Sequence, residues 1–187
     1  IIEENPGKDL RFGIDHCQIT TEEIIEDFSK HRIIGGLELV FLSSDIAIVE
    51  DRVGKRRAEM SYNWKKFHDL GVVVAAGSDS PVEEYSPLHG IYAAVSRRDY
   101  SGKPEGGYNP KEKISVDQAI RAFTTGPAYA TFEENVKGSI EVGKYEDMVV
   151  LNQDLYTVDP LNIKEVKICK TIINGKIAYN GDLPANH

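Results

Sequence analysis

An apolar run that ends in a carboxylate constrains the fold of this chain more than any other stretch. The run is Val72-Val-Val-Ala-Ala-Gly-Ser-Asp-Ser-Pro81, and turn residues flank it on both sides. A continuous run of β-branched and small residues is typical of a parallel strand that is covered on both faces. Asp79 then stands at the carboxyl end of the strand, where α/β proteins place their active sites. The alternative is that Asp79 or Ser80 caps a helix that begins near Pro81.

The composition limits what this carboxylate can belong to. The chain has 187 residues, 41% hydrophobic and 28% charged, which predicts one soluble domain or a domain and a half. Its net charge of -8 argues against nucleic acid or an anionic membrane as a partner. No apolar run is long enough for a transmembrane helix, and the first residues lack the pattern of a signal peptide. Cys17 and Cys169 form no CxxC pair, which favours a reduced, cytoplasmic protein over a disulfide scaffold.

A short strand and a helix are predicted near the N-terminus. Residues 11–17 read as the strand, with His16 at its end. Thr20 and Glu23 then predict a capping box at the start of a helix. Taken alone, a histidine in this position is either a metal ligand or a buried side chain whose nitrogens bond to the backbone.

A second strand and helix lie between His16 and Asp79. Residues 33–42 form the strand candidate, although Gly35 and Gly36 weaken its centre. A polar segment follows over residues 43–55, and one helix is predicted over residues 56–70. Three strands with short connections through helices predict adjacent parallel strands joined by right-handed crossovers. We therefore expect His16 and Asp79 at the same end of one sheet.

The pattern changes in the last third of the chain. Helices are predicted over residues 87–96, which begin on a proline, and over residues 115–124, with Ser115 as the cap. A Gly- and Pro-rich loop separates them. Residues 144–152 and 166–179 instead alternate in the β manner, and Asn174-Gly175 is a hairpin signal.

A set of motifs runs in collinear order through nearly the whole chain: Ile14-Asp-His-Cys-Gln18, Gly77-Ser-Asp-Ser-Pro81, Pro87-Leu-His-Gly-Ile91, Ala93-Ala-Val-Ser-Arg97, Gln118-Ala-Ile-Arg-Ala-Phe-Thr124, and Lys137-Gly-Ser-Ile-Glu-Val-Gly-Lys144 leading into Asp147-Met-Val-Val-Leu151. Together they resemble the C-terminal part of a metal-dependent amidohydrolase, in the branch of the N-substituted formamide deformylases. The resemblance implies an α/β fold. Residues 1–136 would supply about strands six to eight of a (β/α)8 TIM-type barrel, and residues 137–187 the C-terminal share of a small β-sandwich.

The same resemblance implies the chemistry of the site. The family binds one or two divalent metals, with zinc the expected ion, at the C-terminal face of the barrel. His16 matches the ligand at the end of the sixth strand. Asp79 matches the strand-eight residue that binds the metal and accepts a proton from the attacking water. Such a metal lowers the pKa of bound water towards roughly 7, and imidazole and carboxylate suit zinc as ligands.

His89 and Arg97 are the predicted substrate-binding residues. His89 lies in a proline-rich turn near the site, whereas Arg97 either faces a substrate carboxylate or pairs with one of the surplus acidic residues. The sequence also departs from the family pattern, because residues 36–38 stand where many relatives have Gln-Pro.

The ligand set is incomplete in this sequence. The family's first-strand His-x-His, its bridging lysine or equivalent and its fifth-strand histidine have no counterpart. A complete barrel takes about 250 residues, whereas only about 125 precede the β tail. We therefore expect a metal-dependent hydrolase of C–N bonds in small amide- or formamide-type molecules, inactive as this fragment alone. The alternative is a non-catalytic remnant or assembly module that pairs its open β edges with another chain. Both predict a homo-oligomer or pairing with a missing N-terminal segment.

Overall fold

Two separate sheets organise the chain in the computed structural model, which describes residues 1–2 and 4–181. The first sheet is parallel, in the order β1-β2-β3, and consists of β1 (Gly13–Ile14), β2 (Ile34–Leu37) and β3 (Val74–Ala76). The second is antiparallel, in the order β4-β5-β6, and consists of β4 (Met148–Leu151), β5 (Ile168–Ile173) and β6 (Lys176–Asn180). The predicted adjacent parallel strands and the predicted antiparallel tail are both confirmed, but β1 is shorter than the predicted 11–17, and the predicted strand over 33–42 ends at Leu37, since Phe41–Asp45 form helix α2.

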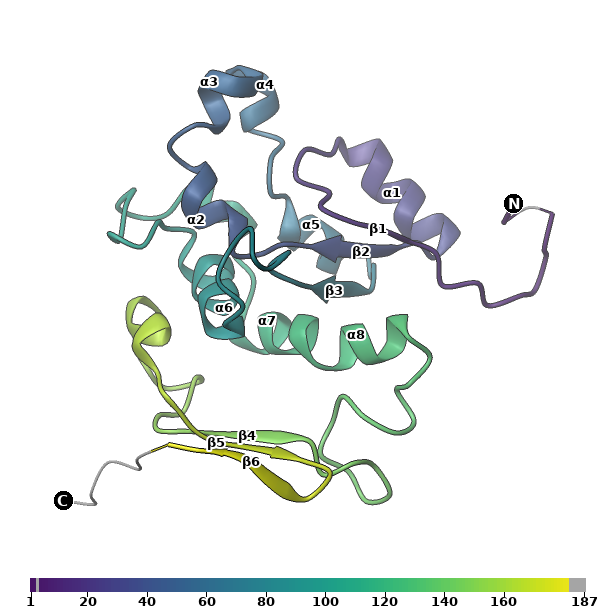
Figure 1. The fold of residues 1–187 in the computed structure, drawn as a ribbon. Helices are drawn as coiled ribbons and strands as arrows, with labels where there is room; N and C mark the ends of the chain where they lie inside the picture. The colour runs from purple at the N-terminus through teal and green to yellow at the C-terminus, as the bar shows by residue number, and fades with distance from the viewer. Residues whose placement is uncertain (3, 182–187) are drawn as a thin grey trace.

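Helices pack on both sides of the parallel sheet (Figure 1). On one side lie α1 and α5, on the other α6 to α8, and the β4–β6 sheet lies beyond α7 and α8. The helical segments are α1 (Glu22–His31), α2 (Phe41–Asp45), α3 (Val49–Val53), α4 (Lys55–Ala58), α5 (Trp64–Asp69), α6 (Pro87–Ser96), η1 (Pro110–Glu112), α7 (Val116–Phe123), α8 (Thr125–Ala130) and η2 (Pro160–Glu165). Within residues 1–2 and 4–181, no helix has the length and apolar character needed to cross a membrane.

Glycines allow the elements around β2 and β3 to approach closely. A Cβ on Gly35 would lie 3.1 Å from the ring of Phe67, and one on Gly36 would overlap the carboxylate of Asp15. A Cβ on Gly126 in α8 would overlap the backbone oxygen of Val74 in β3. The two glycines that weaken β2 in the sequence are therefore required by its neighbours, because close packing leaves no space for side chains there.

Two predicted helix starts agree with the structure. Ser115 caps α7 and accepts a hydrogen bond from the backbone N–H of Gln118 at 3.1 Å, and the Gln118 side chain completes the capping box. Pro87 begins α6, and its missing N–H costs nothing in the first turn of a helix. The structure places no helix start at Pro81, so Asp79 is not a helix cap.

The predicted capping box at Thr20 is wrong. Thr21 is the N-cap of α1 and its side chain accepts from the Ile24 N–H at 3.4 Å. Thr20 is buried instead, and its N–H donates to the carbonyl of Met60 at 3.4 Å. Threonine caps equally well at either position, so this tertiary contact decides between them.

The predicted single helix over residues 56–70 is also wrong. Helix α4 ends at Ala58 and α5 starts at Trp64, and between them Tyr62 adopts a left-handed backbone conformation with φ of 56°. The Tyr62 hydroxyl donates to the carboxylate of Asp45. The polar segment over residues 43–55, for which no helix was predicted, contains α3 and the end of α2.

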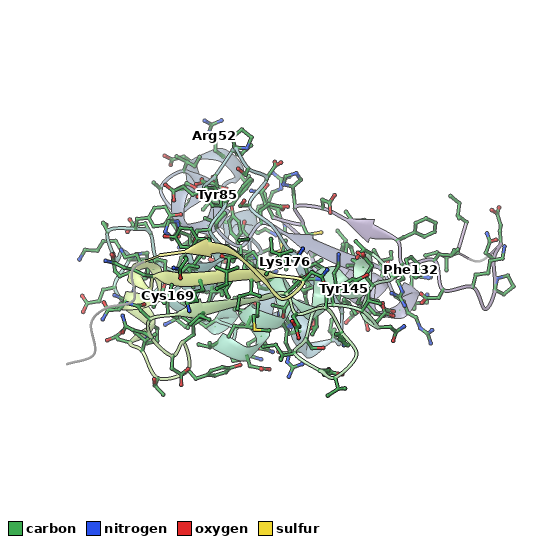
Figure 2. All side chains as sticks on the ribbon, turned by 60° about the horizontal axis from the view of Figure 1, so that its bottom comes forward. Arg52, Tyr85, Phe132, Tyr145, Cys169 and Lys176 are labelled. Atoms are coloured by element: carbon green, nitrogen blue, oxygen red, sulfur yellow. The ribbon has the colours of Figure 1, made fainter. Side chains whose placement is uncertain are left out.

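The C-terminal hairpin turns at Asn174 and Gly175, both with positive φ (49° and 73°), as predicted. Figure 2 looks onto this sheet, with Cys169 and Lys176 labelled on its strands. Cys169 is buried, whereas several apolar side chains on the three strands are exposed, namely Val149, Val150, Ile173, Ile177 and Tyr179. The sheet therefore has apolar surface that the described residues leave uncovered.

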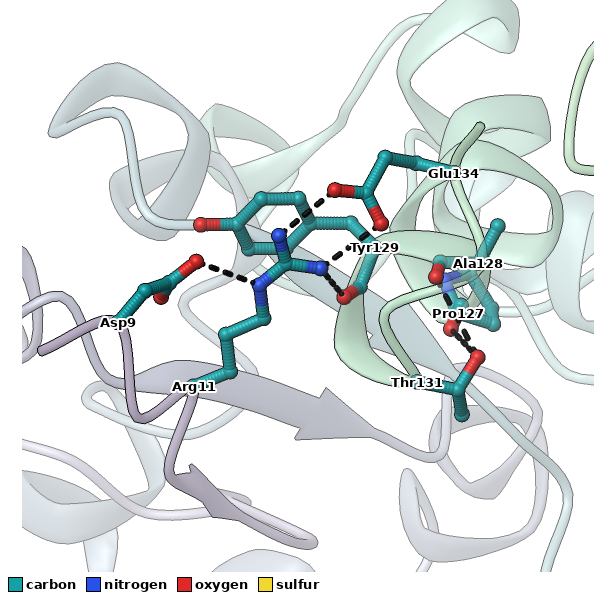
Figure 3. A network of polar contacts seen from close by, with 7 residues as sticks. All are labelled: Asp9, Arg11, Pro127, Ala128, Tyr129, Thr131 and Glu134. Atoms are coloured by element: carbon teal, nitrogen blue, oxygen red, sulfur yellow. Dashed lines mark hydrogen bonds and ion pairs between the residues drawn. The ribbon is translucent and has the colours of Figure 1, made fainter. Parts of the chain in front are cut away.

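An arginine network joins the segment before β1 to the end of α8 (Figure 3). The Arg11 guanidinium donates to Glu134 at 2.6 and 2.8 Å and to Asp9 at 2.9 Å. It also lies over the ring of Tyr129, 3.9 Å from the centroid. Because α8 packs on β3, the network links both outer strands of the parallel sheet. The hydrogen bonds from Arg11 hold the pKa of Glu134 at about 2, against an ordinary value of 4.5.

We expect the contribution of Glu134 to stability to depend on pH. Its folded-state pKa is lowered, so the stabilisation is fully present above about pH 4.5 and is lost as the pH falls towards 2. Urea unfolding should show Glu134→Gln less stable than the wild type at pH 6, with the difference shrinking below pH 4.5. The exposed Glu105→Gln is the control and should show no such trend. A difference that stays constant down to pH 2.5 would contradict the ion pair.

Candidate functional site

Three ionisable side chains follow the carboxyl ends of the three parallel strands. His16 comes after β1, Glu38 directly after β2, and Asp79 after β3. Because the strands are parallel and adjacent, these ends meet at one edge of the sheet. His16 and Asp79 both have left-handed backbones, with φ of 69° and 51°. Such strained conformations cost about 1–3 kcal/mol each and cluster at functional sites.

His16 and Glu38 are in direct contact. The Nδ1 atom of His16 lies 3.3 Å from Oε2 of Glu38, and the two side chains are 48% and 12% exposed. This is an ion-pair distance rather than a hydrogen bond, and Oε2 has no hydrogen-bond partner among the described residues. The half-exposed His16 is therefore not the buried, backbone-bonded histidine of the alternative prediction.

Glu38 is the electrostatic centre of this edge. Burial raises its pKa above the ordinary value, the nearby imidazole of His16 acts in the opposite direction, and the charges of Asp15 and Asp79 add to the rise. The carboxylates of Asp15, Glu38 and Asp79 are thus close enough to interact. A Cβ on Gly77 would lie 3.7 Å from Oε1 of Glu38, so β3 passes beside this carboxylate.

The donor types at this edge fit a divalent cation in part. Imidazole and carboxylate are suitable ligands for zinc and its neighbours. His16 and Asp79 supply one of each, but no group of three such side chains is assembled for a metal in the part of the chain that the structure describes. Burial raises the pKa of the Cys17 thiol to about 11, so this neighbour of His16 stays a thiol at neutral pH. The chain offers part of a metal site.

His89 lies apart from these three side chains. It is on α6, 23% exposed, with Nδ1 at 3.4 Å from Oε2 of Glu84 and its ring 5.3 Å from that of Tyr100. Its partners come from the loops before and after α6. The structure therefore places His89 on the loop side of α6, where a small part of its ring remains accessible.

Arg97 is fully buried. Its guanidinium donates to the carbonyls of Tyr108 at 2.7 Å and Tyr62 at 2.9 Å, and lies 4.8 Å from the ring centroid of Trp64. Burial lowers its pKa to about 10. In this conformation the Arg97 side chain is not accessible to a substrate. Its hydrogen bonds connect the loop before α5 with the loop before η1.

Sequence reasoning missed Glu38 as a site residue and treated it only as a departure from the family pattern. Its position directly after a buried strand was the available signal. The structure also contains a cavity of about 380 Å³, lined by residues 2, 5–12 and 30–32. That cavity lies at the opposite, N-terminal ends of β1 and β2, away from the three ionisable side chains.

Comparisons with known proteins agree on one family. The model of the amidohydrolase family matches residues 3–179. The putative amidohydrolase YtcJ of Bacillus subtilis strain 168 is 36% identical over 179 residues, 95% of this chain and 34% of that protein. The N-substituted formamide deformylase of Arthrobacter pascens is 33% identical over 111 residues, 59% of this chain and 20% of that protein. The chain thus spans about a third or less of these relatives.

Solved structures show the same relationship. An uncharacterised metal-dependent hydrolase from Pyrococcus furiosus superposes with a TM-score of 0.60 at 26% identity, over 71% of this chain and 26% of that one. An uncharacterised metal-dependent hydrolase from Pyrococcus horikoshii OT3 has a TM-score of 0.70 at 22% identity, over 79% and 30% of the two chains. At 22% identity, the similarity to the second structure shows a common fold and nothing further.

The environment of Arg97 predicts a structural effect of its replacement. Arg97→Met should destabilise the fold, because the buried carbonyls of Tyr62 and Tyr108 lose their donor at about 1–3 kcal/mol each. Arg97→Lys should recover only part of the lost stability. The ammonium still donates hydrogen bonds, but it lacks the planar fork with which the guanidinium reaches both carbonyls. Urea unfolding measures both. Unchanged stability in Arg97→Met would contradict the structural role.

Proposed function

The chain belongs to the amidohydrolase family, and from this premise we propose that it supplies part of a metal-dependent active site that hydrolyses a C–N bond in a small amide- or formamide-type molecule. The observation that carries the proposal is the convergence of His16 and Asp79, on strained backbones, at the carboxyl edge of one parallel sheet. This edge is where barrel enzymes build their active sites.

We propose that β1, β2 and β3 are about strands six to eight of a TIM-type barrel formed mainly by residues 1–136. The exposure of β1 supports this assignment, because Phe12 and Ile14 are 42% and 50% exposed along an edge that a preceding strand would cover. Residues 137–187, of which 182–187 lie outside the described part, are proposed as the C-terminal share of a β-sandwich. The uncovered apolar side chains of β4 to β6 support that assignment.

In the proposed mechanism, His16 and Asp79 would hold the cation together with ligands from the remaining strands. The divalent ion, for which we propose zinc in one or two copies, would supply the charge that makes an attacking water acidic. Asp79 would accept a proton from this water and pass it to the leaving amine. Both roles fit a carboxylate that is exposed at the strand end.

The substrate contact proposed on this chain is His89. Its partly exposed ring, on the helix that follows the Asp79 turn, supports this role. Arg97 was the second predicted substrate contact, but its complete burial supports a role in the scaffold instead. We keep the cytoplasmic location as part of the proposal, because the two cysteines, Cys17 and Cys169, are both free.

A non-catalytic assembly module is the second candidate. The lack of a three-residue metal cluster among the described residues favours it, as does the exposed β1 edge. Under this proposal the chain uses that edge to pair with a second copy or with another barrel segment. Catalysis and assembly are separable, because only catalysis requires Asp79.

The test of catalysis uses a longer protein, in which the N-terminal portion of the Bacillus subtilis relative is joined to this segment. We expect this protein to hydrolyse N-substituted formamides, to lose activity with a chelator and to regain it with zinc. Asp79→Asn should lower kcat by about 10²- to 10⁴-fold, because the general base is removed. Asp51→Asn, at an exposed position on α3, is the matched control.

The isolated chain provides the opposite arm of the experiment. Catalytic zinc is normally held by three protein side chains, so we expect weak metal binding and no useful hydrolysis. If the isolated chain hydrolyses the substrate, and a chelator and Asp79→Asn each abolish this activity, then the chain itself supplies enough metal ligands and the expectation is wrong. Full activity of the longer protein after Asp79→Asn would overturn the role given to this residue.

A further inference from the structure

We infer that Glu38 is a positioning residue that holds His16 through Nδ1 and so directs the lone pair of Nε2 to the cation. This inference deepens the proposed function and rests on it. Nothing in the family pattern predicts the contact, because Glu38 stands in the stretch where the sequence departs from many relatives.

The contact geometry is the first argument. Glu38 follows β2 directly and is held by the central strand of the sheet, so its carboxylate is placed by the most constrained backbone at this edge. Its Oε2 lies 3.3 Å from Nδ1 of His16, which comes from the neighbouring strand β1. A rigid, mostly buried carboxylate therefore faces one particular nitrogen of the imidazole.

The chemistry of imidazole is the second argument. A neutral histidine carries a proton on one ring nitrogen and a lone pair on the other. A carboxylate at Nδ1 favours the proton there, because only that tautomer gives the pair a favourable charge and dipole. Nε2 then keeps its lone pair, as a metal ligand requires. In known metal sites, carboxylates that accept from the other ring nitrogen fix the tautomer of a ligand histidine in this way.

The burial pattern argues against a purely structural contact. The His16 side chain is 48% exposed and its φ is 69°, so the fold gains little apolar burial from this residue and bears a strained backbone. Glu38 keeps Oε2 buried without a hydrogen bond from other described residues. Burying the Glu38 carboxylate with His16 as its one ionic partner among the described residues costs stability. A role for Glu38 in orienting His16 would explain why this cost is tolerated.

The experiment measures the tautomer of His16 directly. The full 187-residue chain is labelled with ¹⁵N-histidine, and His16→Gln identifies the His16 signals among the five histidines. Ring ¹⁵N shifts report which nitrogen carries the proton. Three variants are compared with the wild type: Glu38→Leu, which removes the acceptor, Glu38→Gln, which keeps a neutral acceptor, and Asp15→Asn, which removes a neighbouring charge but leaves the contact. Zinc affinity is measured by calorimetry on the same samples and on His16→Ala.

We expect the proton on Nδ1 in the wild type and in Asp15→Asn, and mainly on Nε2 in Glu38→Leu. Zinc affinity should fall about 10- to 100-fold in Glu38→Leu and by much less in Glu38→Gln. A wild type protonated on Nε2, or a tautomer unchanged in Glu38→Leu, would overturn the inference. So would a Glu38→Gln variant that binds zinc as weakly as His16→Ala, since Glu38 would then be a ligand. If Glu38→Leu does not fold, the tautomer of the wild type and the zinc affinity of Glu38→Gln still decide.

The outcome separates this inference from the proposed function. If His16→Ala leaves zinc affinity unchanged, His16 is not a ligand and the proposed metal role fails. The tautomer in the wild type and in Glu38→Leu reports on the contact in that case as well. If His16 binds zinc but its tautomer is the same in the wild type and in Glu38→Leu, the proposed function stands and only the role of Glu38 is refuted.

Discussion

The parallel pairing of three short strands is the constraint on which the rest of the structure depends. In the register of the sheet, Gly35 of β2 is opposite Ile14 of β1 on one side and Val74 of β3 on the other. This register brings the three strand ends to one edge and sets the contact between His16 and Glu38. Close packing maintains it, because Gly35 admits Phe67 of α5 and Gly126 brings α8 onto β3. The Arg11 network then fastens the segment before β1 to the end of α8.

The same arrangement places ionisable side chains at the carboxyl edge of the parallel sheet and leaves apolar side chains exposed near β1 and on the β4–β6 sheet. The strand ends carry a histidine and carboxylates that lie close together, and the pKa of Glu38 is raised mainly by burial, with smaller contributions from Asp15 and Asp79. The exposed Phe12 and Ile14, together with the uncovered side chains of β4 to β6, form apolar surface that the described residues leave open, as the proposed barrel and sandwich would require. The chain, which spans about a third of the relative from Bacillus subtilis, carries candidate ligands at the ends of two parallel strands, and no third donor joins them within the described residues.

Local sequence signals predicted the parts of the fold that depend on local chemistry. The Ser115 cap, the first-turn Pro87 and the Asn174-Gly175 turn each depend on the backbone within a few residues, so the sequence alone identifies them. The region around residues 43–63 was predicted poorly, because Tyr62 breaks the helical pattern in order to reach Asp45. The same limit applies to the site. His16 and Asp79 were found through their strand-end positions, whereas the contact of Glu38 and the burial of Arg97 depend on chain segments that are distant in sequence.

The proposed function requires that His16 and Asp79 face one shared cation position at the carboxyl edge of the sheet. The most direct measurement is anomalous diffraction at the zinc edge from crystals of the chain soaked with zinc. We expect an anomalous peak within coordination distance, about 2.0–2.2 Å, of both Nε2 of His16 and a carboxylate oxygen of Asp79. A peak bound through Nδ1 of His16, or zinc bound only at side chains away from this edge, would contradict it.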